Sequence, residues 1–254
     1  YDQHVVAYLE LLRIPYTGCN PRGLTLARDK ALCKKILSYH RIPVPGFKVF
    51  QKGQRIKPPK KISFPIIVKS LIEESSTGIS QAAIVDSMEK LEERVNFIHR
   101  KIDTDAIAET YIDGRELYVG VIGNKRLKVF PAWEIDLGNL PKDAAPIATY
   151  RVKWDLAYQK RHRIKWRAAN LSKTQESQLV KLSKKIYRAL NLSGYVRFDY
   201  RVSKDGKFYL LEANPNPNVG RFDEFAVSAK AMGIDYEELI QRILTLGIKN
   251  GKYP

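Results

Sequence analysis

The stretch FYLLEANPNPN, residues 208–218, ends an apolar run with a carboxylate and an amide two positions apart. Alternate residues of a β-strand point to the same side, so Glu212 and Asn214 are expected to share a face. Pro215 and Pro217 follow, and proline has no N–H group with which to continue a sheet. The strand should therefore end here and open into a loop, where functional side chains are often found.

The hairpin that ends in this stretch brings a second acid to the same place. Its first strand covers residues 195–202 and its turn is SKDG, so Val202 is expected to pair with Lys207. This register places Arg197 opposite Glu212, and Asp199 becomes the diagonal neighbour of Glu212, with about 7–8 Å between their backbones. The second strand would direct four alternate side chains to one face: Phe208, Leu210, Glu212 and Asn214.

Three oxygen-bearing side chains converge in this arrangement: those of Asp199, Glu212 and Asn214. Two are anionic and none offers sulfur or imidazole, and such a set suits a hard cation such as Mg²⁺. A plainer interpretation stays open, in which Arg197 and Glu212 form a cross-strand ion pair and Asp199 is solvated. The prolines favour the metal site, because they release the strand end into a loop.

The composition is that of an ordinary globular protein. The chain has 254 residues, 44% of them hydrophobic and 28% charged, which suffices for one large domain or two smaller ones with a real core. No apolar run approaches the roughly 18–20 residues that cross a bilayer, and no signal peptide is evident, so we expect no membrane partner. Two cysteines, Cys19 and Cys33, are too few for a disulfide framework or a zinc cluster, which favours a cytoplasmic setting.

The charge is strongly positive. The formal net charge is +17, from 44 basic and 27 acidic residues. Basic residues gather in residues 52–61, five with no acid, and in residues 151–167, seven against the single acid Asp155. Charge of this size attracts polyanions, so nucleic acid stays an open partner, with a solvated face as the alternative.

The pattern along the chain predicts an α+β fold with mainly antiparallel sheets. A helix is expected from Thr25, as its N-cap, through residue 40. Gly123-Asn124 predicts a two-residue hairpin turn. The sheets are expected to form two lobes that meet near residues 110–116.

Other residues suit the binding of a nucleotide. Lys69 ends the apolar run FPIIVK, where a lysine must either extend to solvent or meet an anion. Residues 75–80, SSTGIS, supply hydroxyls, N–H groups and Gly78, a composition that can fold over phosphates and that also occurs in simple turns. Glu109 and Glu116 bracket a turn that could meet an adenine and a ribose, and two exposed strand-end acids are the plainer interpretation.

Taken in order, four segments resemble the ATP-grasp superfamily and, within it, the D-alanine–D-alanine ligases: IPYTGCNPRGLTLARDKALCKKIL, FPIIVKSLIEESSTGIS, AETYIDGRELYVGVIG and GYVRFDYRVSKDGKFYLLEANPNPN. They span nearly the whole chain, and the last is the most specific. The resemblance implies two α+β lobes with antiparallel sheets that enclose ATP, with most of an N-terminal Rossmann-like domain absent. It divides the chain into a remnant of that domain, a smaller central lobe and a catalytic lobe: 1–22, 23–112 and 113–254.

The resemblance also implies a nucleotide site with contributions from both lobes. The lysines that contact the phosphates would be Lys30 and Lys69. The loop that covers the phosphates would contain Ser75, Ser76 and Gly78. The link against adenine would be formed by Glu109, Thr110, Tyr111 and Ile112, and the ribose would contact Glu116.

The activity that the resemblance implies is that of an ADP-forming carboxylate–amine ligase. It would use Mg²⁺, usually two ions, with Mn²⁺ as a substitute, and the ligands would be Asp199, Glu212 and Asn214. Lys153 would steady the transferred phosphoryl group, and Arg197 would stabilise the oxyanion of the tetrahedral intermediate. These roles agree with phosphoryl transfer, which depends on positioning and on neutralisation of charge.

The sequence also departs from the ligase pattern. The dipeptide ligases continue after the asparagine with a Ser-Pro-Gly-Met type segment, whereas this chain has PNPNVGRFDEFA. Asn218 replaces the glycine that helps to form the oxyanion hole, Asp223 falls near the serine that holds the acceptor, and Ser70 replaces a proline after Lys69. An acceptor other than D-alanine is therefore expected.

Three functions follow, in decreasing order of support. The first is a ligase that joins a small-molecule or peptide carboxylate to an amine, with a homodimer as an open alternative to a monomer. The second is an enzyme of the same fold that adds an amino acid such as glutamate to a peptide or protein end. The third is a non-catalytic grasp-fold protein that binds polyanions, which the net charge of +17 suggests.

Overall fold

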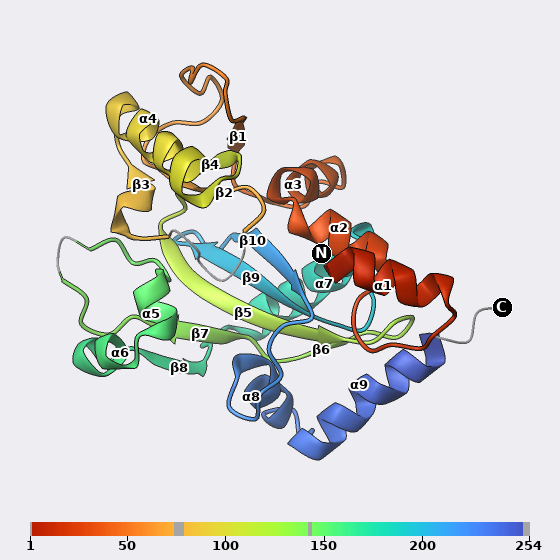
Figure 1. Cartoon of the computed structure of the whole chain (residues 1–254). Helices are drawn as coiled ribbons and strands as arrows, with labels where there is room; N and C mark the ends of the chain where they lie inside the picture. The colour runs from red at the N-terminus through yellow and green to blue at the C-terminus, as the bar shows by residue number, and fades with distance from the viewer. Residues whose placement is uncertain (1, 74–78, 142–143, 251–254) are drawn as a thin grey trace.

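The computed structural model describes residues 2–73, 79–141 and 144–250, and it contains two antiparallel sheets (Figure 1). The smaller sheet has the strand order β1-β4-β2-β3. Its strands are Phe47–Phe50, Ala106–Thr110, Ile66–Ser70 and Ile84–Val85 in that order. Helix α4, Met88–Phe97, begins after the N-cap Ser87 and packs its buried Leu91 and Val95 against the sheet, before a π-helical turn at Ile98–Ile102.

The larger sheet has the strand order β10-β9-β5-β7-β8, and β6 pairs with β5 beside this path. Its strands in chain order are β5 Gly114–Ile122, β6 Lys128–Val129, β7 Trp133–Asp136, β8 Lys165–Ala168, β9 Tyr195–Ser203 and β10 Phe208–Pro215. Residues 111–113 join β4 of the smaller sheet directly to β5, the long central strand of the larger one. The predicted α+β class with antiparallel sheets is confirmed.

One face of the larger sheet is covered by three helices, α2 Pro21–Arg28, α3 Lys30–Tyr39 and α7 Lys173–Ala189. Alternate side chains of β9, among them Phe198 and Tyr200, are fully buried under these helices. The hydroxyl groups of Tyr200 and Ser183 lie 2.8 Å apart, which satisfies the polar end of the buried ring. The alternation leaves the odd-numbered residues of β9 on the opposite face, which is the face of the candidate site.

The helices that the structure describes on the opposite face lie toward its edges. Helices α5, Tyr150–Trp154, and α6, Leu156–His162, lie beside β7 and β8, while α8, Glu224–Lys230, and α9, Tyr236–Asn250, lie beyond the other end of β5 (Figure 1). Helix α1, Asp2–Leu11, packs along α2. No helix within the described ranges is both long enough and apolar enough to span a membrane.

The helix predicted from Thr25 through residue 40 is instead two helices. Asn20, not Thr25, caps the first, and its side chain accepts a hydrogen bond from Gly23 N. Asp29 interrupts the run because its carboxylate accepts from the N–H groups of Ala31 and Leu32, which starts α3 anew. The break places Lys30 at the first position of α3, where it is buried.

The predicted two-residue turn at Gly123-Asn124 is also wrong. Residues 123–127 join β5 to β6. Gly123 N donates to Gly194 O, and Asn124 Oδ1 accepts from Gly194 N. These two residues therefore hydrogen-bond to the loop before β9 and do not form a tight turn by themselves.

Candidate active site

A cleft of about 640 Å³ lies between the two sheets. Ile67, Lys69 and Glu109 line it from the smaller sheet. Nine of the predicted site residues line it: Lys69, Glu109, Thr110, Tyr111, Ile112, Glu116, Lys153, Asp199 and Glu212. The predicted loop residues Ser75, Ser76 and Gly78 lie outside the described residues, while Arg197 and Asn214 line a second cavity that adjoins the cleft.

The two acids of the hairpin face each other across β9 and β10. The predicted register is wrong by one residue, because Phe208 and not Lys207 pairs with Val202. A β-bulge then falls between Leu210 and Glu212, and Glu212 pairs directly with Asp199. Direct partners in an antiparallel pair have Cα atoms about 4.5–5.5 Å apart, so the backbones of Asp199 and Glu212 are closer than in the predicted diagonal arrangement.

The bulge also changes which side chains share a face. Phe208 and Leu210 are buried in the core with Phe198 and Tyr200. One extra residue, Leu211, reverses the alternation, so Glu212 turns to the opposite face. The predicted common face for Phe208, Leu210, Glu212 and Asn214 is therefore wrong.

Two contacts from outside the hairpin hold the bulge. Lys34 Nζ on α3 donates to the carbonyl oxygen of Leu211 at 2.7 Å, and Leu210 N donates to Pro43 O at 3.0 Å. These contacts satisfy backbone groups that the ladder between β9 and β10 leaves unpaired at the bulge. Lys34 was not predicted as a site residue; its only sequence signal is a position one helical turn after Lys30.

Lys34 also belongs to a buried group of three charges. Glu109 is 1% exposed and lies 3.1 Å from Lys34 Nζ and 3.2 Å from Lys69 Nζ. Burial opposes ionisation of Glu109, but the two lysines outweigh it and lower the pKa of the carboxyl group. Burial lowers the pKa of Lys34, whereas the carboxylates of Glu109 and Glu212 outweigh burial at Lys69 and raise its pKa. Glu109 is therefore not the exposed strand-end acid of the plainer interpretation.

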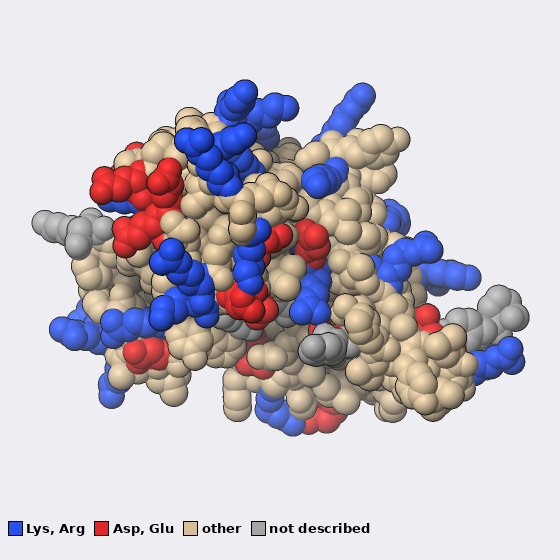
Figure 2. All heavy atoms as spheres, turned by 45° about the horizontal axis from the view of Figure 1, so that its top comes forward, with Lys and Arg blue, Asp and Glu red and all other residues tan. Residues whose placement is uncertain are grey.

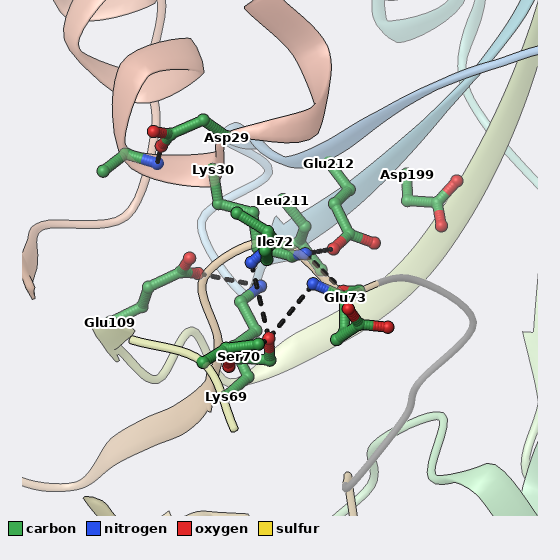
Figure 3. Close-up of polar contacts among 12 residues, drawn as sticks. Asp29, Lys30, Lys69, Ser70, Ile72, Glu73, Glu109, Asp199, Leu211 and Glu212 are labelled. Atoms are coloured by element: carbon green, nitrogen blue, oxygen red, sulfur yellow. Dashed lines mark hydrogen bonds and ion pairs between the residues drawn. The ribbon is translucent and has the colours of Figure 1, made fainter. Parts of the chain in front are cut away.

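Lys30 connects α3 to the acids of the hairpin. Its Nζ donates to Glu73 O at 2.6 Å and lies 3.0 Å from Glu212 Oε1 (Figure 3). Burial raises the pKa of Glu212, but Lys30, Lys69 and Lys153 together outweigh it and lower that pKa on balance. Glu212 thus remains an anion surrounded by lysines.

Arg197 and Lys153 approach Asp199 from the other side. Arg197 forms two hydrogen bonds with Asp199, at 2.8 and 3.1 Å, and Lys153 Nζ is 4.0 Å from the same carboxylate. Both cations lie over the ring of Tyr118, at 5.3 and 5.4 Å from its centroid. Burial opposes the charge on Arg197, but Asp199 outweighs it and raises the arginine pKa. The partner of Arg197 is thus Asp199, not Glu212 as in the simple ion-pair alternative.

Arg201 orders the link between the sheets and was not predicted as a site residue. Its guanidinium donates to Ile112 O at 2.9 Å and to Pro146 O at 2.6 Å, and it lies 3.2 Å from Glu116 Oε2. Tyr111 Oη accepts from the same group at 3.1 Å. Arg201 could have been predicted from the sequence, because the alternation of β9 places it on the same face as Arg197 and Asp199.

Cations outnumber carboxylates in the ion-pair network around the cleft. The described cations are Lys30, Lys34, Lys69, Lys153, Arg197 and Arg201, and the carboxylates are Glu109, Glu116, Asp199, Glu212 and Glu224. Figure 2 shows acidic and basic side chains intermingled near the middle of the face that it displays, with basic side chains along the upper edge. A network with an excess of positive charge suits an anionic ligand.

The hairpin acids fit a hard cation better than a soft one. Among the described residues, no group of three or more His, Cys, Asp and Glu side chains forms a metal site, so a third protein ligand would be an amide. Asn214 pairs with Arg197 across the strands, and its buried Nδ2 has no hydrogen-bond partner among the residues that the structure describes. An unsatisfied buried amide beside two paired carboxylates is consistent with a place where Mg²⁺ and substrate oxygens bind.

Two α+β lobes whose antiparallel sheets enclose a lysine-rich cleft are the arrangement of an ATP-grasp fold. The family model described as D-ala D-ala ligase C-terminus matches residues 36–245. The chain is 30% identical to the D-alanine–D-alanine ligase of Aquifex aeolicus, over 96% of this chain and 77% of the relative. It is 32% identical to an uncharacterized protein of Sinorhizobium fredii, over 95% and 68%.

A solved structure gives the same result. The D-alanine–D-alanine ligase of Bacillus anthracis complexed with ATP superposes with a TM-score of 0.80 at 26% identity, over 98% of this chain and 75% of the other. The chain therefore belongs to the D-alanine–D-alanine ligase family of ATP-grasp proteins.

The charged state of Glu109 should make the fold sensitive to acid. The folded pKa of Glu109 lies below its unfolded value of 4.5, so the unfolded chain takes up the proton first as the pH falls. The stabilisation is complete above about pH 4.5 and is lost as the pH falls toward the folded pKa. Urea unfolding of the wild type near neutral pH and at about pH 4 should show this loss.

Glu109→Gln should remove this part of the pH dependence and lower the stability near neutral pH by about 3–5 kcal/mol, because it leaves two buried lysines without their partner. Glu92→Gln, on the exposed face of α4, is the matched control and should change neither quantity. Equal pH slopes for wild type and Glu109→Gln would contradict the assignment.

Lys34 should matter far more than its exposed neighbour. Lys34→Met removes the partner of Glu109 and of the Leu211 carbonyl, and it should lower the free energy of unfolding by about 3–5 kcal/mol. Lys35→Met on the same helix should change it by less than about 0.5 kcal/mol, because Lys35 is exposed. In a double-mutant cycle, Lys34→Met and Glu109→Gln together should cost less than the sum of the single changes. Additive costs would show that the pair is not coupled.

Proposed function

We propose that the protein is an ATP- and Mg²⁺-dependent ligase that forms an amide bond between a carboxylate and an amine, with release of ADP and phosphate. The observation that carries this proposal is the direct pairing of Glu212 with Asp199 on the wall of the cleft, with Lys30 and Lys153 beside them. Membership of the ligase family and the likeness to an ATP complex support it.

The described residues divide between the two ends of a nucleotide. The link Thr110–Ile112, which Arg201 orders, would face the adenine, and Glu116 would meet the ribose. Lys30 and Lys69 would hold the phosphates, because both are buried at this site and Lys30 Nζ lies 3.0 Å from Glu212. Asp199, Glu212 and Asn214 would hold Mg²⁺, which supplies charge neutralisation at the phosphates.

The reaction would take place where the cleft meets the second cavity. Glu212 and Lys153 line both spaces. A substrate carboxylate oxygen bonds to the γ-phosphorus and ADP leaves; the amine nitrogen then bonds to the acyl carbon, the bond from that carbon to the phosphate oxygen breaks, and the amine gives up a proton. Lys153 would hold the transferred phosphoryl group, and Arg197 would stabilise the oxyanion at the acyl carbon.

The basic segment 151–167 gives limited support to a polyanion-binding protein. Arg167 is paired with Glu134 at 2.8 Å and with Asp136 at 3.3 Å, and Arg151 lies over the ring of Tyr158. Lys153 faces Asp199. Part of this charge thus serves the fold and the site, and we place the enzyme ahead of the non-catalytic alternative.

ATP binding and turnover test this proposal. Calorimetry should show that ATP binds only weakly without Mg²⁺ and that Mg²⁺ strengthens binding. Glu212→Gln should lower phosphate release with the active substrate pair by at least about 100-fold, since even partners of metal ligands cost 10–100-fold when changed. Glu92→Gln is the control for the same chemical change on an exposed surface. Absence of nucleotide binding, or full turnover by Glu212→Gln, would refute the proposal.

A further inference from the structure

A second and larger cavity adjoins the nucleotide cleft. Its volume is about 1800 Å³ when the open space at its mouth is included, and it shares Glu212 and Lys153 with the cleft. Arg197 and Asn214 line the part of its wall that belongs to β9 and β10. A molecule bound in this cavity would therefore reach the residues at which the phosphoryl group is transferred.

The wall of this cavity is unusually rich in aromatic side chains. The chain has three tryptophans, Trp133, Trp154 and Trp166, and all of them line it. Tyr118 forms the inner wall and packs edge-to-face on Trp166, with ring centroids 4.9 Å apart. Phe222 lines the cavity too, from the loop that follows β10. These side chains come from five separate segments, so local sequence does not explain why they meet.

Several apolar groups of this cavity are also exposed. Phe222 is 90% exposed, Leu156 is 78% exposed and Trp154 is 48% exposed. Exposed large apolar side chains that gather around a concave surface are typical of a ligand site, because a ligand with a matching apolar group removes them from water. A methyl group such as the side chain of alanine would leave most of this apolar surface exposed to water.

Carboxylates lie on the same wall. Asp223 and Glu224 line the cavity. Asp223 Oδ2 accepts from Gly220 N at 2.9 Å, and Glu224 lies 3.8 Å from Arg197. Two carboxylates near the place of acyl transfer favour the approach of an ammonium group, the charged form of an amine substrate.

From these observations, and on the basis of the proposed function, we infer that the amine substrate carries an aromatic side chain and that this side chain binds among Trp154, Trp166 and Phe222. The substrate class is an aromatic amino acid or a comparable aromatic amine. The cavity supplies the apolar and aromatic surface, and Asp223 with Glu224 supplies the charge that complements the ammonium group.

Intrinsic fluorescence gives a direct binding test, because the three tryptophans of the chain all line this cavity. The protein with ADP and Mg²⁺ is titrated with L- or D-phenylalanine, alanine or glutamate, and the tryptophans are excited where phenylalanine does not absorb. One enantiomer of phenylalanine should change the emission at a concentration at least about tenfold lower than alanine or glutamate. An equal response to alanine, or no response to phenylalanine, overturns the inference.

Variants at the mouth of the cavity give a second test. Phe222→Ala and Leu156→Ala alter exposed side chains and are expected to fold. Each should raise the KM for the aromatic amine about 2- to 10-fold relative to the KM for ATP, which corresponds to the loss of one aromatic or aliphatic contact. Tyr39→Ala removes an aromatic ring that is 85% exposed on α3 and is the matched control.

The two proposals fail in different ways. If ADP forms with a non-aromatic amine as efficiently as with any aromatic one, the inference is overturned while the ligase proposal stands. If no amine supports ADP formation and ATP does not bind, the ligase proposal itself fails. An unchanged KM ratio in both Phe222→Ala and Leu156→Ala also overturns the inference.

Discussion

The hydrogen bond from Lys34 to the carbonyl oxygen of Leu211 holds the feature on which the site depends. Without the bulge at Leu211, strict alternation would keep Glu212 on the same face as Leu210, which is buried in the core. With the bulge, Glu212 turns to the side of Asp199 and two anions stand opposite each other. Such a pair is unfavourable by itself and is stable here because Lys30, Lys153 and Arg197 face it.

The same lysine joins that bulge to the smaller sheet. Lys34 lies between Leu211 of the larger sheet and Glu109 of β4, and Lys69 of β2 completes the pairing of Glu109. A buried ionic group of this kind adds little net stability, because desolvation offsets attraction, but a missing partner is costly. Its effect is to fix positions. Contacts of Lys34 on α3 join the two walls of the cleft and hold them in place relative to each other.

Much of the site could be predicted from the sequence, because its chemistry is local. Strand alternation brought Asp199 near Glu212, and the buried Lys69 required an anion, which the structure provides as Glu109. The register could not be predicted, since a bulge depends on contacts from α3 and Pro43 that are remote in the chain. The break at Asp29 was missed because a capping carboxylate within a helical pattern resembles an ordinary surface acid.

The aromatic cavity shows why specificity is harder to predict than chemistry. The cations proposed to bind phosphate and the hairpin acids come in short motifs, so their order along the chain indicates a shared role. Trp133, Trp154 and Trp166 belong to β7, α5 and β8, and they share a surface because those elements pack on the side of the larger sheet that runs from Tyr118 of β5 to the edge strand β8. The choice of residues that neutralise phosphate is limited by a reaction that a whole family shares. The choice of residues on this wall is limited by the molecule that binds there. A chain can therefore keep the cleft of its family and still present a different surface to the second substrate.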